Sequence, residues 1–191
     1  MNLLDRVLYR GQHTCPWWFC FTFDNPLRRR LQKPDLVLKG LLQQGQTALD
    51  IGCGMGYFSL AMAQIVGPTG KVICIDMQEK MLEMARRRAQ RAGFNNVMQF
   101  HRCTADSLGL KVTCDFALSF WMVHEVRDQR KFLGEVRDLL KEGGTLLIAE
   151  PKLHVAEAAF NETISWAEAA GFAVANRPAI SMSRAVLFKK L

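Results

Sequence analysis

Residues 48–58 read Ala-Leu-Asp-Ile-Gly-Cys-Gly-Met-Gly-Tyr-Phe, and this stretch decides the fold. An apolar strand carries the acid Asp50, the glycines Gly52, Gly54 and Gly56 follow at every second position, and a helical pattern comes next. A backbone that passes close under a ligand needs glycines, because a Cβ would block the approach. The following helix turns its N-terminal N–H groups and the positive end of its dipole towards the same place. The stretch is therefore typical of a loop that binds a nucleotide-type cofactor, with a carboxylate at its edge.

The glycine spacing separates two classes of cofactor. Dinucleotide-binding loops carry G-x-G-x-x-G with a phosphate at the helix terminus, whereas this chain has G-x-G-x-G and Tyr57 in the place of the third dinucleotide glycine. Asp50 would also repel a pyrophosphate, and it suits a positively charged ligand. Both features disfavour a nicotinamide-dependent oxidoreductase, which would share the same type of sheet.

This loop resembles motif I of the class I S-adenosylmethionine-dependent methyltransferases, whose cofactor carries an ammonium and a sulfonium group. The resemblance implies S-adenosylmethionine as the cofactor and S-adenosylhomocysteine as its product. Tyr57 is expected to order the amino-acid end of the cofactor or the substrate. Motif I assigns cofactor contacts to Asp50, Gly52, Cys53, Gly54, Gly56 and Tyr57.

Short apolar strands alternate with helical patterns from residue 47 onward, which predicts an α/β fold with a doubly wound, mostly parallel sheet. The expected strands are 47–51, 71–75, 97–102, 115–120, 145–150, 172–177 and 181–190. The expected later helices are 78–92, a helix from the cap Asp128 to Leu140 that Gly143-Gly144 ends, and 161–170. Only about a dozen residues separate the third and fourth strands, so the helix between them is short or missing. The resembled family implies seven strands, the last inserted antiparallel, with an antiparallel edge hairpin.

The polar residues that follow these strands are the candidate site, because ligands of doubly wound sheets bind at the carboxyl ends of the strands. Asp76 lies 26 residues after Asp50, where an acid can accept hydrogen bonds from both ribose hydroxyls. Met77 can lie against the adenine face. The resembled family places an acid after the third strand at the adenine amino edge, which matches Asp106 after Ala105.

A second match begins at the end of the fourth strand. Residues 119–126 (Ser-Phe-Trp-Met-Val-His-Glu-Val) and the run 135–144 resemble the small-molecule branch of the family, including quinone-biosynthesis and arsenite methyltransferases. The run 135–144 has one residue more than the family pattern. The resemblance covers about residues 47–190 and implies cofactor contacts at Ser119 and Phe120. Metal-dependent catechol methyltransferases carry an acid at these positions, so no metal is expected.

Methyl transfer is expected to proceed by in-line displacement, for which a dry, well-aligned pocket supplies much of the catalysis. His124 is the candidate base where the acceptor must lose a proton. A loop histidine that packs beside Trp121 is the alternative. The candidate substrate contacts are Trp17, Trp18, Phe21, Trp121 and Glu150.

Residues 1–45 precede the strand–helix pattern and form an expected aromatic-rich cap or substrate segment, while residues 46–191 form the methyltransferase domain. The aromatic cluster at 17–23 can cap the core or wall a pocket. Cys15 and Cys20 can pack as apolar residues or bind a thiophilic acceptor. The chain has six cysteines and no C-x-x-C, so neither a zinc ribbon nor a thioredoxin-type motif is indicated.

Composition limits the class of protein. With 191 residues, 49% of them apolar, the chain fits one globular domain. No run approaches the roughly 18 apolar residues of a membrane span, and the first residues lack a signal-peptide layout, so a cytoplasmic location without membrane contact is expected. The net charge of +7 allows an anionic acceptor. The runs Arg28–Arg30 and Arg86–Arg88 carry much of it, the second more simply as a solvated helix face.

Two other functions stay open at this point. The chain can be a catalytically inactive module that binds S-adenosylmethionine, with its pocket closed by the aromatic segment. It can also be an RNA methyltransferase, which the basic charge favours; however, Asn-Pro-Pro-Tyr and Pro-Cys, the signatures of nucleic-acid base methylation, are missing after the fourth strand. The sequence leaves the methyl acceptor and the oligomeric state open.

Overall fold

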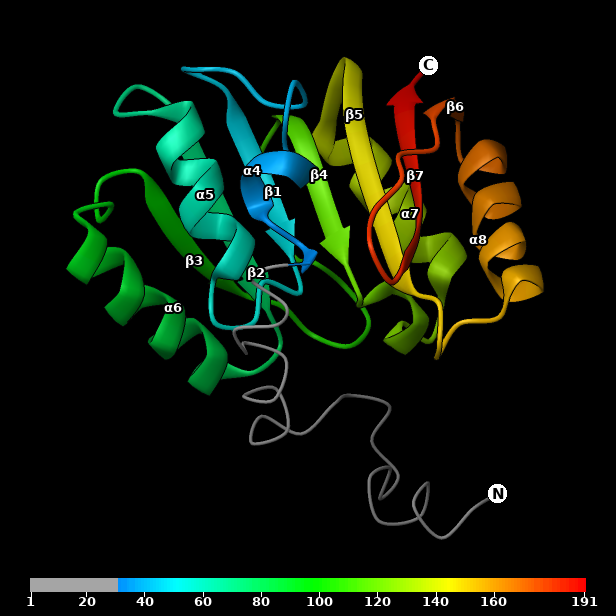
Figure 1. Cartoon of the computed structure of the whole chain (residues 1–191), viewed down its shortest axis with the longest axis horizontal. Helices are drawn as coiled ribbons and strands as arrows, with labels where there is room; N and C mark the ends of the chain where they lie inside the picture. The colour runs from blue at the N-terminus through cyan, green and yellow to red at the C-terminus, as the bar shows by residue number, and fades with distance from the viewer. Residues whose placement is uncertain (1–30) are drawn as a thin grey trace, which may run out of the picture.

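The fold is that of a computed structural model that describes residues 31–191, and it is built on one seven-stranded sheet (Figure 1). The strand order is β3-β2-β1-β4-β5-β7-β6. Neighbouring strands are parallel except on both sides of β7, which pairs antiparallel with β5 and β6. This confirms the predicted fold class. The strands are β1 (Thr47–Ile51), β2 (Lys71–Asp76), β3 (Met98–Arg102), β4 (Cys114–Phe120), β5 (Leu140–Pro151), β6 (Phe172–Asn176) and β7 (Ser183–Lys190).

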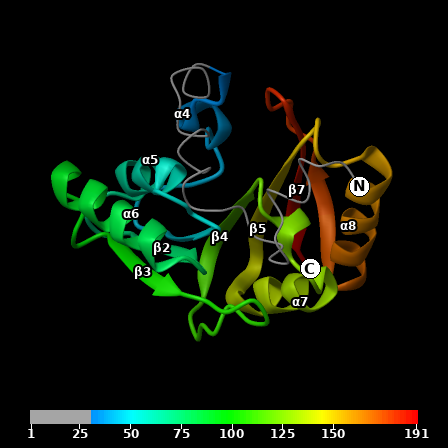
Figure 2. The same cartoon turned by 90° about the horizontal axis from the view of Figure 1, so that it is seen from below.

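Helices cover both faces of the sheet, as the doubly wound pattern requires (Figure 2). On one face, α5 (Tyr57–Val66) and α6 (Glu79–Ala92) bury Phe58, Met62 and Leu82 against β1, β2 and β4, and the short α4 (Pro34–Val37) leads into the same layer. On the other face, α7 (Gln129–Leu139) and α8 (Glu157–Ala169) pack Leu133 and Phe160 into a second core. The central strands are buried on both sides, which explains their continuous apolar sequences.

The connection from β3 to β4 contains no helix, as the short spacing predicts. Residues 103–113 cross the sheet as an extended segment instead. Leu108 of this segment is buried in the core on the α7 side, and its backbone N–H donates to Glu135 of α7 over 2.7 Å. This bond lets a segment without internal helical hydrogen bonds lie against the sheet.

The end of α7 differs from the prediction. The helix ends at Leu139, and β5 begins at once with Leu140, so Gly143 and Gly144 lie inside a strand. The register moves from Cys114 opposite Leu140 to Phe116 opposite Thr145, which leaves the intervening residues of β5 bulged. A Cβ on Gly144 would lie 2.9 Å from the carbonyl oxygen of Lys141. The two glycines therefore serve a bulge, not a helix terminus.

Two smaller features complete the fold. Helix α8 begins at Glu157, four residues before the predicted start at residue 161. No helix among residues 31–191 is long and apolar enough to cross a bilayer.

The Asp128 cap gives a test of the fold. Its side chain accepts a hydrogen bond of 3.0 Å from the backbone N–H of Lys131 at the start of α7. Asp128→Ala should lower the free energy of unfolding by about 1 kcal/mol, because one N-terminal N–H of the helix loses its acceptor. Asp138→Ala, on the exposed side of the same helix, is the matched control and should change it by less than about 0.5 kcal/mol. Equal midpoints for the two variants in urea unfolding would contradict the cap.

Candidate active site

The glycine loop between β1 and α5 is tied to the end of β2. The backbone N–H groups of Gly52 and Cys53 both donate to the carbonyl oxygen of Ile75, over 2.8 and 3.0 Å. The N–H of Gly54 donates to the Asp76 carboxylate over 2.9 Å. These bonds fix the loop at the carboxyl edge of the sheet, where the arrowheads of β1 and β4 point in Figure 1.

Two of the glycines are required for different reasons. A Cβ on Gly52 (φ +72°) would lie 2.5 Å from Cγ of Met122, so the backbone passes directly beneath that side chain. A Cβ on Gly54 (φ +53°) would meet no protein atom within 4 Å. Gly54 therefore presents bare backbone to open space at the sheet edge, which is the property expected of a loop that a ligand crosses.

Asp50 lies behind the loop. Its side chain is 2% exposed, and it accepts a hydrogen bond from the hydroxyl of Ser59 on α5. This pairing has no signal in the sequence, since a serine in the first turns of a helix is common. Asp50 thus joins the end of β1 to α5, and this anchoring role stands beside the predicted contact with a cationic ligand.

Asp76 faces the site with a carboxylate that two backbone groups hold in place. Oδ2 accepts from Gly54 N–H and Oδ1 accepts from Gln78 N–H, each over 2.9 Å. Burial raises the pKa of Asp76, while the N–H groups of Gln78, Gly54 and Met77 act in the opposite direction. Each carboxylate oxygen has a second lone pair, so the group can still accept two hydroxyl protons from a ligand.

The other predicted cofactor contacts on this side follow neighbouring strands. Met77 is half-buried after β2, and its carbonyl oxygen accepts from Arg102 Nε over 3.2 Å. Ala105 and Asp106 are exposed in the turn after β3, which the bond from Thr104 N–H to the Ser107 carbonyl closes. Since β2 and β3 are adjacent and parallel, the structure brings these residues to the same edge as Asp76.

Cys53 is a neutral thiol within this loop. Its pKa is raised well above its usual value, first by a hydrogen bond with Cys74 and then by burial. The four cysteines of the described region are all free, and three of them (Cys53, Cys74 and Cys114) are buried. They behave as small apolar residues, as expected for cysteines in strands.

An aromatic run connects the loop to the end of β4. The ring of Phe58 lies 4.4 Å from that of Phe120 between centroids, and the ring of Phe120 lies 5.7 Å from that of Trp121. Tyr57 stands edge-on to Phe58 at 5.2 Å. The predicted contacts Tyr57, Phe120 and Trp121 therefore belong to one continuous aromatic cluster, in which Phe58 and Phe120 are buried.

Trp121 and Ser119 have unusual environments. Trp121 has φ +60°, a conformation that is rare for a bulky residue and is most often kept at functional sites. Its indole N–H donates to Ser183 Oγ over 2.9 Å, which ties the ring to the start of β7, on the far side of β5 from β4. The hydroxyl of Ser119 is fully buried at the end of β4 and has no hydrogen-bond partner among the residues described.

His124 and Glu150 form a pair at the carboxyl ends of β4 and β5. His124 lies in the short 3-10 helix η2 (Val123–Glu125) after β4, and its Nδ1 contacts Oε2 of Glu150 at the end of β5. The other oxygen of Glu150 accepts from the backbone N–H of Val123 over 2.8 Å. Glu150 is 2% exposed, so it lies behind His124 within the protein.

Gln32 and Ser183 also lie at this edge, and sequence reasoning missed both. The carbonyl of Gln32 accepts from Tyr57 Oη over 3.1 Å, and its side-chain amide donates to the Ser181 carbonyl over 3.0 Å. Ser183 lies in a predicted strand, and the sequence does not show which face of the sheet its side chain is on. The predicted contacts Trp17, Trp18 and Phe21, together with Cys15 and Cys20, lie outside the described residues and stay predictions.

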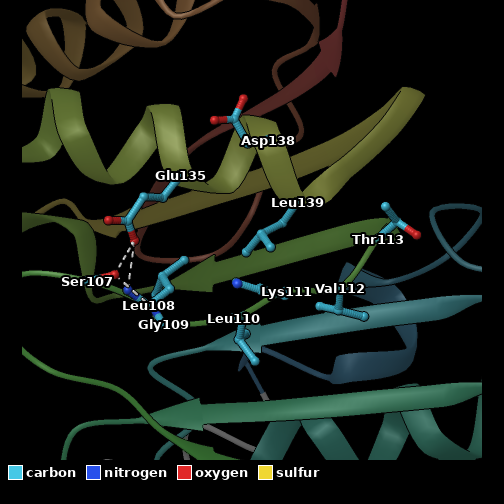
Figure 3. Close-up of a pocket in the computed structure, with 10 residues that line it drawn as sticks. All are labelled: Ser107, Leu108, Gly109, Leu110, Lys111, Val112, Thr113, Glu135, Asp138 and Leu139. Carbon is cyan, nitrogen blue, oxygen red and sulfur yellow. Dashed lines mark hydrogen bonds between the residues drawn. The ribbon is translucent and has the colours of Figure 1, made fainter.

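A hollow of about 740 Å³ opens elsewhere, between the 107–113 segment and α7. Figure 3 shows Glu135 on its wall, bonded to Ser107 and to Leu108 N–H. None of the predicted site residues lines this hollow, which exists because an extended segment stands where a helix would fill the layer.

A seven-stranded sheet with an inserted antiparallel strand, a glycine loop after β1 and an acid after β2 defines the class I methyltransferase type of architecture. A family model described as "Methyltransferase domain" matches residues 42–177. The chain belongs to this methyltransferase-domain family, which confirms the class of enzyme predicted from the sequence.

Individual relatives agree with this assignment. The demethylmenaquinone methyltransferase of Oceanobacillus iheyensis is 28% identical over 123 residues, which are 64% of this chain and 52% of that protein. The ubiquinone/menaquinone biosynthesis C-methyltransferase UbiE of Escherichia coli is 32% identical over 110 residues, 57% of this chain and 44% of that protein. The chain thus spans about half the length of these curated relatives. The solved structure of a SAM dependent methyltransferase from Aquifex aeolicus superposes with a TM-score of 0.84 at 26% identity, covering 93% of this chain and all of that one.

The close approach at Gly52 can be tested by stability alone. Gly52→Ala and Gly54→Ala share the cost of a positive φ, about 1–2 kcal/mol, but only the first new Cβ meets Met122. Gly52→Ala should therefore lower the free energy of unfolding by about 1–3 kcal/mol more than Gly54→Ala. In a double-mutant cycle measured in urea, Met122→Ala should recover part of the loss in the Gly52→Ala protein. Equal losses for the two alanine variants, with no coupling to Met122, would contradict this packing.

Proposed function

We propose that this chain transfers a methyl group from S-adenosylmethionine to a small-molecule acceptor by metal-independent in-line displacement. The observation that carries the proposal is the pairing of Gly54 and Asp76. Bare glycine backbone faces open space beside a buried carboxylate, at the carboxyl edge of the sheet and next to the switch between β1 and β4.

The residues present fit this cofactor. Asp76 would accept hydrogen bonds from the two ribose hydroxyls, and Met77 and Asp106 would contact the adenine. Gly52, Gly54 and Tyr57 would hold the amino-acid end of the cofactor. The buried hydroxyl of Ser119, which has no hydrogen-bond partner among the described residues, lies at the end of the adjacent strand β4. When bound, S-adenosylmethionine would supply an electrophilic methyl group on a sulfonium centre.

The acceptor side is apolar and aromatic. The half-buried ring of Trp121, which packs against the buried Phe120, would contact a planar acceptor, and His124 is the residue that would take up a proton. Relatives named for demethylmenaquinone and ubiquinone/menaquinone methylation support an acceptor related to quinones. We propose a small, quinone-like acceptor for this chain. The net charge of +7 is compatible with an anionic one.

The N-terminal segment is proposed to contribute to the acceptor pocket. Gln32 is held at the site edge by Tyr57 and Ser181, so the chain that precedes it starts from that edge. Leu38 and Leu42 pack into the core beside α5, so the last part of residues 1–45 is continuous with the domain. Trp17, Trp18 and Phe21 would reach the acceptor from there.

The basic residues of α6 give little support to RNA as the acceptor. Arg86 lies over the ring of Phe100 and near Glu79, and Arg88 donates to the Met55 carbonyl. Two of the three consecutive arginines thus serve the fold, which leaves a short basic surface rather than a stripe that follows a phosphate backbone.

Cofactor binding tests the first half of the proposal. S-adenosylhomocysteine should bind in calorimetry, and nicotinamide dinucleotide should not. Asp76→Ala should weaken binding by about 3–6 kcal/mol, because two hydrogen bonds to a charged group are lost, each worth about 1.5–3 kcal/mol. Asp138→Ala, on α7, is the control and should bind as the wild type does. An unchanged affinity in Asp76→Ala would contradict the ribose assignment, and a chain that binds the dinucleotide instead would contradict the proposed cofactor.

Turnover tests the second half. With a reduced naphthoquinone and with a cell extract as acceptors, methylated product is read by mass spectrometry. His124→Phe should lower turnover by roughly 10²–10⁴ while the affinity for S-adenosylhomocysteine stays unchanged. Unchanged turnover would remove His124 as the base. Tight cofactor binding with no methylated product from any acceptor would identify an inactive binding module, and methylated RNA with salt-dependent binding would identify a nucleic-acid enzyme.

A further inference from the structure

Glu150 is a carboxylate that the fold buries at the acceptor side of the site. It ends the buried part of β5 with 2% of its surface exposed, and both of its oxygens have partners. Burying a carboxylate is costly unless it is paired and hydrogen-bonded. Its partners are the backbone N–H of Val123 and the ring of His124, and both belong to the turn η2 that carries the candidate base.

We propose that Glu150 is the positioning residue of this site: it holds His124 with a proton on Nδ1, so that Nε2 is the basic atom for an acceptor that must lose a proton. The proposal rests on the proposed function and deepens it, since it names the kind of acceptor: one whose reacting oxygen, nitrogen or activated carbon bears an ionisable proton.

The hydrogen-bond inventory assigns the tautomer. An ionised carboxylate only accepts hydrogen bonds, so the ring nitrogen that contacts Glu150 Oε2 must donate. In neutral imidazole the other nitrogen, Nε2, then carries the lone pair. When Nε2 takes up a proton, the imidazolium lies against a carboxylate that already faces it, so no group has to reorganise.

Further contacts hold the ring in this orientation. The ring of His154, in the connection from β5 to α8, stands edge-on to that of His124 at 4.9 Å between centroids. The segment that carries His124 is tied to β5 by Trp121 N–H to the Ala149 carbonyl, over 2.7 Å, and by Val123 N–H to Glu150. The position of the base is therefore set by a strand of the central sheet and not by a loop alone.

The step balances without a further reactant. The acceptor X–H forms its new bond from X to the methyl carbon, the electron pair of the broken carbon–sulfur bond goes to sulfur, and the proton from X goes to Nε2 of His124. The imidazolium afterwards releases that proton to water. An acceptor with no proton to lose, such as a tertiary amine, gains nothing from this arrangement.

The tautomer can be measured on the wild-type chain without substrate. Proton–nitrogen correlation spectra of the ¹⁵N-labelled protein, recorded above the titration of the ring and assigned with His124→Phe, should show His124 with its proton on Nδ1. Gln has only one side-chain oxygen, so in Glu150→Gln that oxygen would have to accept from both Val123 N–H and the ring to keep the proton on Nδ1. The Nδ1–H tautomer should therefore lose its dominance in this variant. An Nε2–H tautomer, or a ring doubly protonated throughout, in the wild type would overturn the proposal.

Turnover in a double-mutant cycle separates positioning from simple structural support. With 1,4-naphthohydroquinone as the probe, Glu150→Gln should lower kcat by roughly 10²-fold, and in the His124→Phe background the same substitution should have no further effect. Glu157→Gln, the same change on the exposed first turn of α8, is the matched control and should act as the wild type. Additive losses in the cycle would overturn the proposal.

Binding of S-adenosylhomocysteine keeps the two proposals distinguishable. It should be unchanged in Glu150→Gln, because the hydrogen bonds of the Glu150 carboxylate go to Val123 and His124 of η2 and not to the glycine loop. If the wild-type chain binds this product and turns over the probe while Glu150→Gln remains fully active, the positioning role fails and the proposed function stands. If the wild type binds no cofactor, the proposed function fails, whatever tautomer His124 adopts.

Discussion

The hydrogen bonds that fasten the glycine loop to β2 are the constraint on which the site depends. Three backbone N–H groups of the loop, at Gly52, Cys53 and Gly54, find their acceptors on Ile75 and Asp76. Because these acceptors belong to a central strand of the sheet, the loop inherits the rigidity of the core. Asp76 is thus a structural acceptor and the proposed ligand group at once, and its burial follows from the first of these roles.

A second set of bonds fastens the opposite side of the edge in the same manner. The segment after β4 is tied to β5 through Trp121 N–H, Val123 N–H and the ring of His124. One set holds the loop that would bind the donor, and the other holds the proposed base. In-line transfer demands that both partners be positioned within fractions of an ångström, and strands β1 and β4, adjacent in the sheet, supply that common frame.

Much of the fold and part of the site could be predicted from the sequence. Buried parallel strands show as continuous apolar runs, and the Asp128 cap has a local signature, so both were predicted correctly. Gly143-Gly144 was misread, because a glycine pair after a helix looks the same whether it ends the helix or makes room for a bulge in the next strand. The distinction depends on the register with β4, which is a long-range property.

The site shows the same division. The position of Asp76, His124 and Glu150 at one edge follows from strand order, but their partners do not. Ser59 behind Asp50, and Ser183 behind Trp121, are small polar residues whose significance comes only from what lies opposite them. The left-handed backbone of Trp121 has no sequence signal either, since Trp is not a residue that favours positive φ.

Because no helix connects β3 to β4, the two halves of the sheet differ in how well they are covered on the α7 side. β3 is an edge strand with one neighbour, and on the α7 side the extended segment 103–113 lies against it, where the Leu108 carbonyl contacts the ring of His101 of β3 over 2.7 Å. Local opening is cheapest where cover and pairing are thinnest, so amide hydrogens of β3 should exchange with solvent well before those of β1 and β4. A nucleoside bound at the ends of β2 and β3 would then stabilise this less covered part of the sheet. Part of its binding free energy would be used to suppress local opening there.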